Sequence, residues 1–166
     1  MLRDRPTNSR LTIGSPRQKA TAIAPACIGN FGPGLDVIGV AIGGPVDRVT
    51  AVRDGSAGVV IDDPGHAELP TDPTRNTAGI AAQEVLRRSG ADVGVRLTVV
   101  KGLPLFGGQG GSAASAVAAA VATNRLLGDP LDIPSLIESA VEAEAVVSGR
   151  HADNVAPQLL GGVVLV

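Results

Sequence analysis

Residues 101–115 read Lys101-Gly-Leu-Pro-Leu-Phe-Gly-Gly-Gln-Gly-Gly-Ser-Ala-Ala-Ser115, and this stretch decides the fold. Before it, residues 93–99 place an apolar side chain at every second position, which predicts a strand. After it, residues 112–127 are rich in alanine, the best helix former, and predict a helix. Glycines before a helix let backbone N–H groups approach an anion, and the helix dipole adds about 0.3–1 kcal/mol. The stretch therefore indicates either a phosphate-binding loop or a flexible turn that leads into a helix.

The rest of the chain alternates predicted strands with predicted helices. Capping residues and apolar spacing predict helices that open at Asn76 and at Asp132 and that end near Gly90 and Ser148. The alternation indicates an α/β or α+β domain. Residues 1–19 carry five basic side chains and one acid, and we expect a disordered N-terminal tail there, with a transit peptide as the alternative. Strands are predicted over 20–24, 35–42, 48–53, 59–61, 93–99 and 163–166.

Composition excludes several classes of protein. The 166 residues include two Phe, no Tyr and no Trp, and the formal net charge is −2. Because stacking platforms and a basic surface are both missing, we expect no nucleic-acid partner. The only cysteine, Cys27, with His66 and His151 cannot make a structural zinc site. No apolar stretch reaches the roughly 18 residues of a membrane helix, and no secretion signal is visible, so we expect a cytoplasmic location.

Three nucleotide-binding patterns compete for the glycine-rich loop. The pattern G-x-x-x-x-G-K-[ST] fails, because no Gly-Lys pair occurs in the chain. The pattern G-x-G-x-x-[GA] matches Gly108, Gly110 and Ala113, but Pro104 and other loop residues separate it from its strand. The third pattern is a proline, a few residues and a glycine/serine loop that ends in Ser-Ala-Ala. It resembles the phosphate loop of the GHMP kinases, P-x-x-x-G-L-G-S-S-A-A.

The loop departs from that family pattern at two positions. Gln109 stands where the family has Leu, and Gly111 stands where it has the first Ser. The second Ser, which the resemblance associates with Mg²⁺, is present as Ser112. We therefore expect weaker nucleotide binding without loss of the hydroxyl for the metal.

A stretch near the start resembles the first GHMP motif in the form that homoserine kinases use, P-A-T-x-A-N-L-G-P-G-F-D. It reads Ala24-Pro-Ala-Cys-Ile-Gly-Asn-Phe-Gly-Pro-Gly-Leu-Asp36. Asn30 and Asp36 match the two polar positions that contact the substrate in the family. The alternative is a turn in which both side chains bond to their own backbone.

A third stretch resembles the homoserine kinase signature E-x-x-x-S-G-x-H-A-D-N-x-A-P. Here Glu144 lies four residues before Ser148, and Ser148-Gly-Arg-His-Ala-Asp-Asn154 follows. The resemblance makes Glu144 the carboxylate linked to Mg²⁺, and it places His151 and Asn154 at the homoserine site. A solvated helix end and a transition-metal site are the alternatives, and the latter lacks a third ligand.

The resemblance implies an α+β, two-layer GHMP kinase N-terminal domain over residues 20–166, with a mixed sheet packed on helices and the C-terminal domain absent. It also implies ATP-dependent phosphorylation of L-homoserine with Mg²⁺. Asp36, Ser112, Glu144 and Asn154 would serve catalysis, with Asp36 as an optional general base. Ser112 and Glu144 would hold the metal, and Asn30, Asp36, His151 and Asn154 the substrate. Asn76, Pro104, Gly108, Gly110, Gly111 and Ser112 would hold the nucleotide.

Two other functions stay open at this point. A different small-molecule kinase of the superfamily would share the loop, but it would lack the cluster His151-Ala-Asp-Asn154. An inactive or incomplete fragment or paralogue would keep the motifs without the third glycine motif and the basic residues of a second domain. The sequence also leaves a homodimer open.

Overall fold

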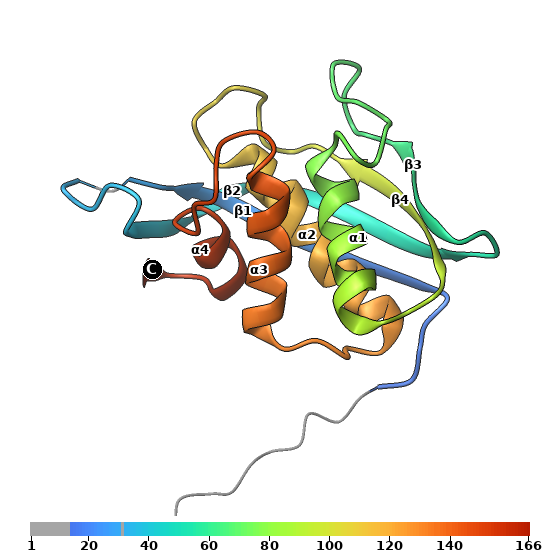
Figure 1. Ribbon diagram of the computed structural model, residues 1–166. Helices are drawn as coiled ribbons and strands as arrows, with labels where there is room; N and C mark the ends of the chain where they lie inside the picture. Colours follow the sequence, from blue (N-terminus) through green and yellow to red (C-terminus); the bar gives the residue numbers. More distant parts are fainter. Residues whose placement is uncertain (1–13, 31) are drawn as a thin grey trace, which may run out of the picture.

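The computed structural model describes residues 14–30 and 32–166, and Figure 1 shows the arrangement of their helices and strands. Along the chain these are β1 (Lys19–Ile28), β2 (Ile38–Asp54), β3 (Gly58–Asp63), α1 (Thr77–Ser89), β4 (Gly94–Val100), α2 (Gly111–Leu127), α3 (Ile133–Glu144), α4 (Val155–Leu160) and β5 (Val163–Leu165). The expected α+β fold is confirmed. Among the described residues, no helix is both long and apolar enough to cross a bilayer.

The sheet is mixed, as expected. Its strands lie in the order β1-β2-β4-β3, and β5 pairs with the start of β2. The pair β3–β4 is parallel, and the other pairs are antiparallel. Alternation along β1 buries Ala20, Ala22 and Ala24 on the face that the helices cover. This one-sided burial fixes the register, because a slip of one residue would turn the apolar set to solvent.

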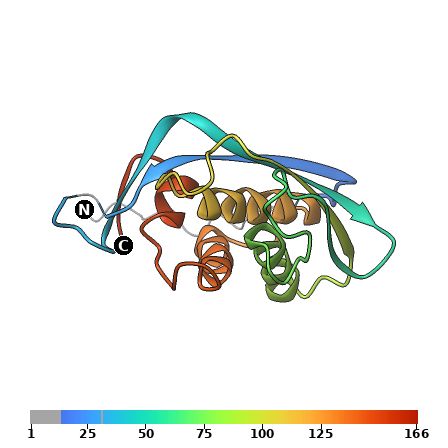
Figure 2. The same ribbon diagram turned by 90° about the horizontal axis from the view of Figure 1, so that it is seen from above.

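Helix α2 lies at the centre of the molecule. It runs beneath the sheet, and α1 and α3 lie on its other side (Figure 2). Because protein surrounds it, 13 of its 17 residues are buried, as for a helix that is apolar on every side. Alanine supplies helix propensity and lets the sheet and the neighbouring helices approach the α2 backbone closely. The glycine-rich loop therefore leads into the most deeply buried helix of the fold.

The helix starts follow from their caps. Asn76 Oδ1 accepts a hydrogen bond from the Ala78 backbone N–H, and Asp132 does the same for Ser135. Both caps satisfy donors that the first turn leaves unpaired. The predicted starts at these two residues are confirmed.

Several predicted boundaries are wrong. The strands expected over 35–42 and 48–53 belong to one strand, β2, because the residues between them stay extended beside β1, and residues 35–37 form a turn before that strand begins at Ile38. The register places Ala26 opposite Ile42 but Pro25 opposite Val46, so a bulge absorbs the extra residues. Helix α3 ends at Glu144 rather than near residue 148, and α4 was not predicted at all.

The expected tail boundary also shifts. Residues 1–13 lie outside the described part of the chain. The Gly14 N–H donates to the Gly128 carbonyl, and the Arg17 N–H donates to the Leu126 carbonyl. These bonds attach residues 14–17 to the end of α2, so ordered structure begins before residue 20.

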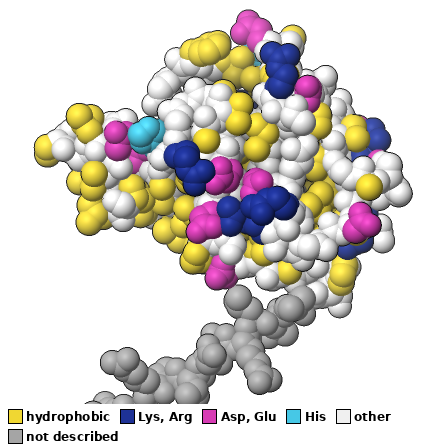
Figure 3. All heavy atoms as spheres, in the orientation of Figure 1, with side chains coloured by type: hydrophobic (Ala, Val, Ile, Leu, Met, Phe, Trp, Pro, Cys, Tyr) yellow, Lys and Arg dark blue, Asp and Glu magenta, His cyan; other side chains and the backbone are white. Residues whose placement is uncertain are grey.

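Figure 3 shows that exposed hydrophobic side chains gather at the end of the sheet that carries β5 and the loop before β2. Leu35, Val163 and Leu165 are each about two-thirds to three-quarters exposed there (67%, 72% and 75%). Elsewhere on the same face, acidic and basic side chains are interspersed (Figure 3). The apolar surface therefore borders one end of the molecule rather than covering the helical face.

A buried carboxylate joins three parts of this fold. Asp47 on β2 is completely buried and accepts hydrogen bonds from the backbone N–H groups of Gly102 and Leu103, each at 3.0 Å. It also accepts from Ser115 Oγ on α2, at 2.7 Å, and it forms an ion pair with the Lys101 ammonium group. Since its oxygens meet four donors, this buried charge is both neutralised and hydrogen-bonded.

We predict that Asp47→Ala lowers the free energy of unfolding by about 3–5 kcal/mol, because it leaves the buried Lys101 ammonium group without its counter-ion. Urea denaturation followed by circular dichroism measures this change. The control is Asp92→Asn, which alters an exposed aspartate before β4 and should change stability by less than about 0.5 kcal/mol. Similar losses in both variants would contradict the anchoring role of Asp47.

Candidate active site

The glycine-rich loop wraps around the N-terminus of α2. Gly108 and Gly110 have φ values of +65° and +69°, in the left-handed region that favours glycine. Gly110 is the N-cap of α2, and no side chain in the described part of the chain caps the helix there. A Cβ at Gly110 would lie 2.5 Å from Cys27 Sγ, so no larger residue fits without displacement. The first turn of α2 thus keeps backbone donors for an anion, which is the arrangement expected of a phosphate loop.

Lys101 stabilises this loop through hydrogen bonds of its ammonium group. Its Nζ donates to the Gly111 carbonyl at 2.8 Å and to Ser115 Oγ at 3.0 Å, besides its ion pair with Asp47. The loop before α2 is therefore held at its start by Asp47 and at its end by Lys101. The Lys101 side chain also lines the adjoining pocket, where its charge is balanced by Asp47.

A pocket of about 480 Å³ opens beside the loop. Its wall runs from Pro70 and Asn76 near the start of α1 to Ser112 on α2 and Ser148 after α3. Its size lies within the range of sites for small molecules and cofactors. It joins the expected nucleotide residues Asn76, Pro104, Gly108, Gly110, Gly111 and Ser112 in one wall.

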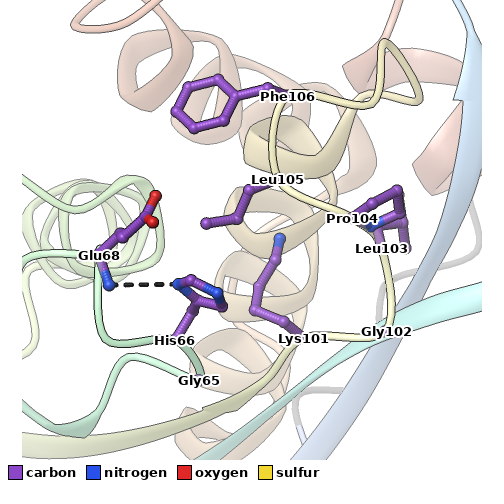
Figure 4. A pocket seen from close by; sticks show the side chains of 9 residues that line it. All are labelled: Gly65, His66, Glu68, Lys101, Gly102, Leu103, Pro104, Leu105 and Phe106. Atoms are coloured by element: carbon purple, nitrogen blue, oxygen red, sulfur yellow. Dashed lines mark hydrogen bonds between the residues drawn. The ribbon is translucent and has the colours of Figure 1, made fainter.

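A second cavity, of about 610 Å³, shares part of that wall (Figure 4). His66 and Glu68 stand on one side of it and Leu105 and Phe106 on the other, with Lys101 between them (Figure 4). Phe106 is 98% exposed and has a φ of +57°, which is strained for a non-glycine residue. The glycine-rich loop and the segment 64–70 therefore line two neighbouring cavities that share part of one wall.

Asn76 uses one lone pair and one N–H of its amide to fix the local fold. Its Oδ1 caps α1, and its Nδ2 donates to the Pro70 carbonyl at 2.9 Å. Thr77 Oγ1 in turn donates to the Ser112 carbonyl at 3.1 Å. Asn76 thus shapes the pocket by fixing the segment before α1 and the start of the helix.

Ser112 and Glu144 come together, as the resemblance implied. Ser112 Oγ donates to Glu144 Oε2 at 3.0 Å, and Ser148 Oγ donates to the same oxygen at 3.1 Å. Glu144 is 5% exposed, and its other oxygen, Oε1, is buried without a hydrogen-bond partner among the described residues. Burial raises the pKa of the Glu144 carboxyl, because desolvation disfavours the charged form. Such an under-coordinated buried oxygen is suited to a cation.

Asn30, Asp36 and His151 form a separate exposed group. Asn30 Oδ1 accepts a hydrogen bond from the Asp36 backbone N–H at 2.7 Å, and both residues have a φ of +58°. His151 Nδ1 lies 3.3 Å from Asp36 Oδ1. The Asn30 oxygen thus bonds within its own loop, as in the alternative that the sequence left open, while the Asp36 carboxylate faces His151.

Asn154 lies closer to the phosphate loop. Its Oδ1 accepts a hydrogen bond from Cys27 Sγ at 2.9 Å, and it would lie 3.1 Å from a Cβ at Gly110. Gln158, one turn further along α4, donates its Nε2 to the Gly110 carbonyl at 2.9 Å. Helix α4 therefore connects the 149–154 segment to the N-terminus of α2.

Sequence reasoning missed the residues that support this site. Asp47 and Lys101 lie 54 residues apart; Asp47 belongs to no motif that the sequence showed, and Lys101 begins the quoted loop without a role assigned to it. Gln158 follows one quoted motif and Cys27 lies within another, but the sequence assigned no role to either. The one signal was Lys101 itself, a lone basic residue at the end of a strand that leads into the loop. In the described parts of the chain, no cluster of three His, Cys, Asp or Glu residues could hold a metal.

Comparison with known proteins places this geometry in a family. The model of the GHMP kinases N terminal domain matches residues 76–162. Homoserine kinase of Methanopyrus kandleri is 47% identical over 143 residues, which are 86% of this chain and 46% of that protein. Homoserine kinase of Arabidopsis thaliana is 46% identical over 149 residues, 86% of this chain and 40% of that protein. The chain thus spans about half the length of these curated relatives.

Solved structures agree with the sequence relatives. Homoserine kinase from Cytophaga hutchinsonii superimposes with a TM-score of 0.86 at 38% identity, covering 95% of this chain and 51% of that one. Mevalonate kinase of Methanococcus jannaschii shares the fold, with a TM-score of 0.68 at 13% identity over 88% of this chain and 52% of that one. Since the family model covers more than half of the chain, the chain belongs to the GHMP kinases and contains their N-terminal domain.

Proposed function

We propose that this chain holds ATP and L-homoserine for phosphorylation of the homoserine hydroxyl group. The observation that carries the proposal is the meeting of three distant motifs at the N-terminus of α2. Glu144 contacts Ser112, Asn154 lies against the Gly110 backbone, and Cys27 of the first motif bonds to Asn154. The relatives named homoserine kinase supply the substrate class.

The nucleotide would occupy the 480 Å³ pocket with its phosphates on the glycine-rich loop. Free backbone donors at the start of α2 would attract the negative charge. Gly111 leaves more space there than the serine of the family pattern, and its carbonyl is bound by Lys101.

The donor set also fits Mg²⁺. The ion prefers hard oxygen ligands and usually keeps several waters, so it needs only one or two protein groups. Ser112 Oγ and Glu144 provide them, and Glu144 Oε1 is buried without a partner among the described residues. When bound, the ion would neutralise charge on the phosphate oxygens.

The substrate would lie between Asn154 and the pair of Asp36 and His151. The exposed Asp36 carboxylate suits a cationic ammonium group, and the Asn154 amide suits a hydroxyl or carboxylate oxygen. In the transfer, the hydroxyl oxygen forms a bond to the γ-phosphorus while the bond to the β,γ-bridging oxygen breaks and ADP leaves. The hydroxyl proton passes to solvent or to Asp36. Such a reaction depends mainly on positioning and charge neutralisation.

A coupled ADP-release assay with homoserine on the purified chain tests the proposal, with calorimetric titration of ATP as a second measurement. Homoserine-dependent ADP release supports the kinase. ATP binding without ADP release would favour the alternative of an incomplete domain. This alternative agrees with the finding that the chain covers 46% of the Methanopyrus kandleri protein. A chain that binds neither ligand would contradict the proposal.

We predict that Ser112→Ala lowers kcat by at least roughly ten-fold. Removal of a group that only hydrogen-bonds to a metal ligand already costs that much, and Ser112 would bind the metal itself. The KM for homoserine should change far less, because Ser112 faces Glu144 rather than the substrate. Steady-state kinetics separate the two constants, and Ser56→Ala, at an exposed turn, is the control. Equal kcat in the wild type and Ser112→Ala would exclude the metal role.

Glu144→Gln should raise the Mg²⁺ concentration needed for half-maximal rate by roughly 10- to 100-fold, because the amide keeps the shape and loses the charge. Titration of the rate with Mg²⁺ measures this shift. Glu142→Gln is the matched control, since Glu142 lies two residues before Glu144 but pairs with Arg150 and not with Ser112. An unchanged Mg²⁺ requirement in Glu144→Gln would remove Glu144 from the metal site.

For the substrate side, Asn154→Leu should raise the KM for homoserine by roughly ten-fold, since it removes a hydrogen-bonding group of similar size. The KM for ATP should stay within about two-fold in the same assay. A thermal melt checks that the variant folds. If the two KM values rise equally, Asn154 acts on the fold and not on the substrate.

A further inference from the structure

The two ends of the Asn154 amide meet two different buried groups. Oδ1 accepts from the Cys27 thiol at 2.9 Å, and Nδ2 faces Asp153 Oδ2 at 3.4 Å. We propose that Cys27 and Asp153 are positioning residues that hold the Asn154 amide in one orientation at the homoserine site. We call the contacts of Cys27 and Asp153 with the Asn154 amide the clamp. The role of Asn154 toward homoserine rests on the function proposed above, whereas the clamp itself rests on these contacts.

The chemistry of the two partners gives the clamp its direction. A carboxylate only accepts, so it must face the amide nitrogen, and the amide oxygen is then placed where the thiol can donate to it. A flipped amide would set its oxygen against the Asp153 carboxylate and would leave the thiol as a weak acceptor. One orientation of Asn154 is therefore favoured.

Burial keeps both partners out of water, and it keeps the Cys27 thiol protonated. Cys27 is 0% exposed and Asp153 is 1% exposed. Burial raises the pKa of the Cys27 thiol to about 12, and the charges of Asp153 and Glu144 act in the same direction. The thiol thus remains a hydrogen-bond donor throughout the neutral pH range. Asp153 Oδ1 has no hydrogen-bond partner among the described residues, so the Asn154 N–H is the one donor that its side chain meets there.

Two glycines leave room for the clamp. A Cβ at Gly29 would lie 2.3 Å from Asp153 Oδ2 and 2.8 Å from Asn154 Nδ2. A Cβ at Gly110 would lie 2.5 Å from Cys27 Sγ. The backbone after β1 therefore packs closely against Asp153, and the backbone of the phosphate loop packs closely against Cys27.

The clamp also ties Asn154 to the phosphate loop. The Cys27 backbone N–H donates to the Gln109 carbonyl at 3.1 Å, while the Cys27 side chain holds Asn154. One residue thus contacts both the loop proposed for the γ-phosphate and the amide proposed for the substrate. Beyond its bonds to Cys27 and Asp153, the Asn154 amide has one N–H and one lone pair left for homoserine. Cys27 and Asp153 set the direction in which these two groups point.

The test compares Cys27→Ala, which removes the donor, with Cys27→Ser, which retains one. We expect Cys27→Ala to raise the KM for homoserine roughly three- to ten-fold, the usual effect of one hydrogen bond, with little change in the KM for ATP. Cys27→Ser should stay within about two-fold of the wild type. A general loss of structure would instead affect both KM values and would not be rescued by serine.

A second measurement does not depend on activity. In the ¹⁵N-labelled chain, the side-chain NH₂ signals of Asn154 are assigned by their loss in Asn154→Asp. They should be well separated and exchange slowly in the wild type and in Cys27→Ser, and they should shift and exchange faster in Cys27→Ala. Asp153→Asn should perturb the same signals, because its amide can oppose either end of Asn154.

The outcomes separate the two proposals. Unchanged Asn154 signals in Cys27→Ala and Asp153→Asn would overturn the clamp, whatever the enzyme does. Equal KM values for homoserine in Cys27→Ala and Cys27→Ser would overturn its role at the substrate. If the wild-type chain shows no binding of homoserine by calorimetry while the signals respond as expected, the clamp stands and the proposed kinase function fails.

Discussion

The buried charge of Asp47 is the interaction on which the rest of the structure depends. Its carboxylate receives the backbone N–H groups of Gly102 and Leu103, the hydroxyl of Ser115 and the ammonium group of Lys101. These donors belong to the segment after β4 and to α2, while Asp47 itself lies on β2. A carboxylate so far from water is stable only with all its partners in place, so the start of the glycine-rich loop has one position.

This constraint explains how a loop of small residues can be ordered. Glycine loses more conformational freedom on folding than any other residue, so the segment from Gly107 to Gly111 contributes little to its own stability. Lys101 fixes the end of the loop through the Gly111 carbonyl, and Gln158 fixes the N-cap through the Gly110 carbonyl. Protein groups thus occupy the carbonyls on one side of the loop. The N–H groups of the first turn of α2 are left for a ligand.

The sequence predicted the local parts of this arrangement well. The caps at Asn76 and Asp132, the alanine-rich helix and the alternating strand before the loop each depend on neighbours within a few residues. The contact of Ser112 with Glu144 was expected only through the resemblance, because no spacing rule joins residues 32 apart. Asp47, Cys27 and Gln158 stayed hidden because their partners lie 48 to 127 residues away. Helix α4, six residues long, is stabilised by burial of Val155 and Ala156 rather than by a local signal.

The Asp47 network also explains why the fold tolerates two buried carboxylates beside the loop whose oxygens are not all hydrogen-bonded. Glu144 and Asp153 each have one oxygen without a hydrogen-bond partner among the described residues, and desolvation works against the charge of Glu144. An apolar core would not retain such groups, because each lowers the stability of the fold. Their presence is reasonable if a ligand contacts the free oxygen of Glu144 and if Asp153 orients the Asn154 amide. At the proposed site these carboxylates therefore work against stability, and the Asp47 network, which needs no ligand, keeps the surrounding backbone in place.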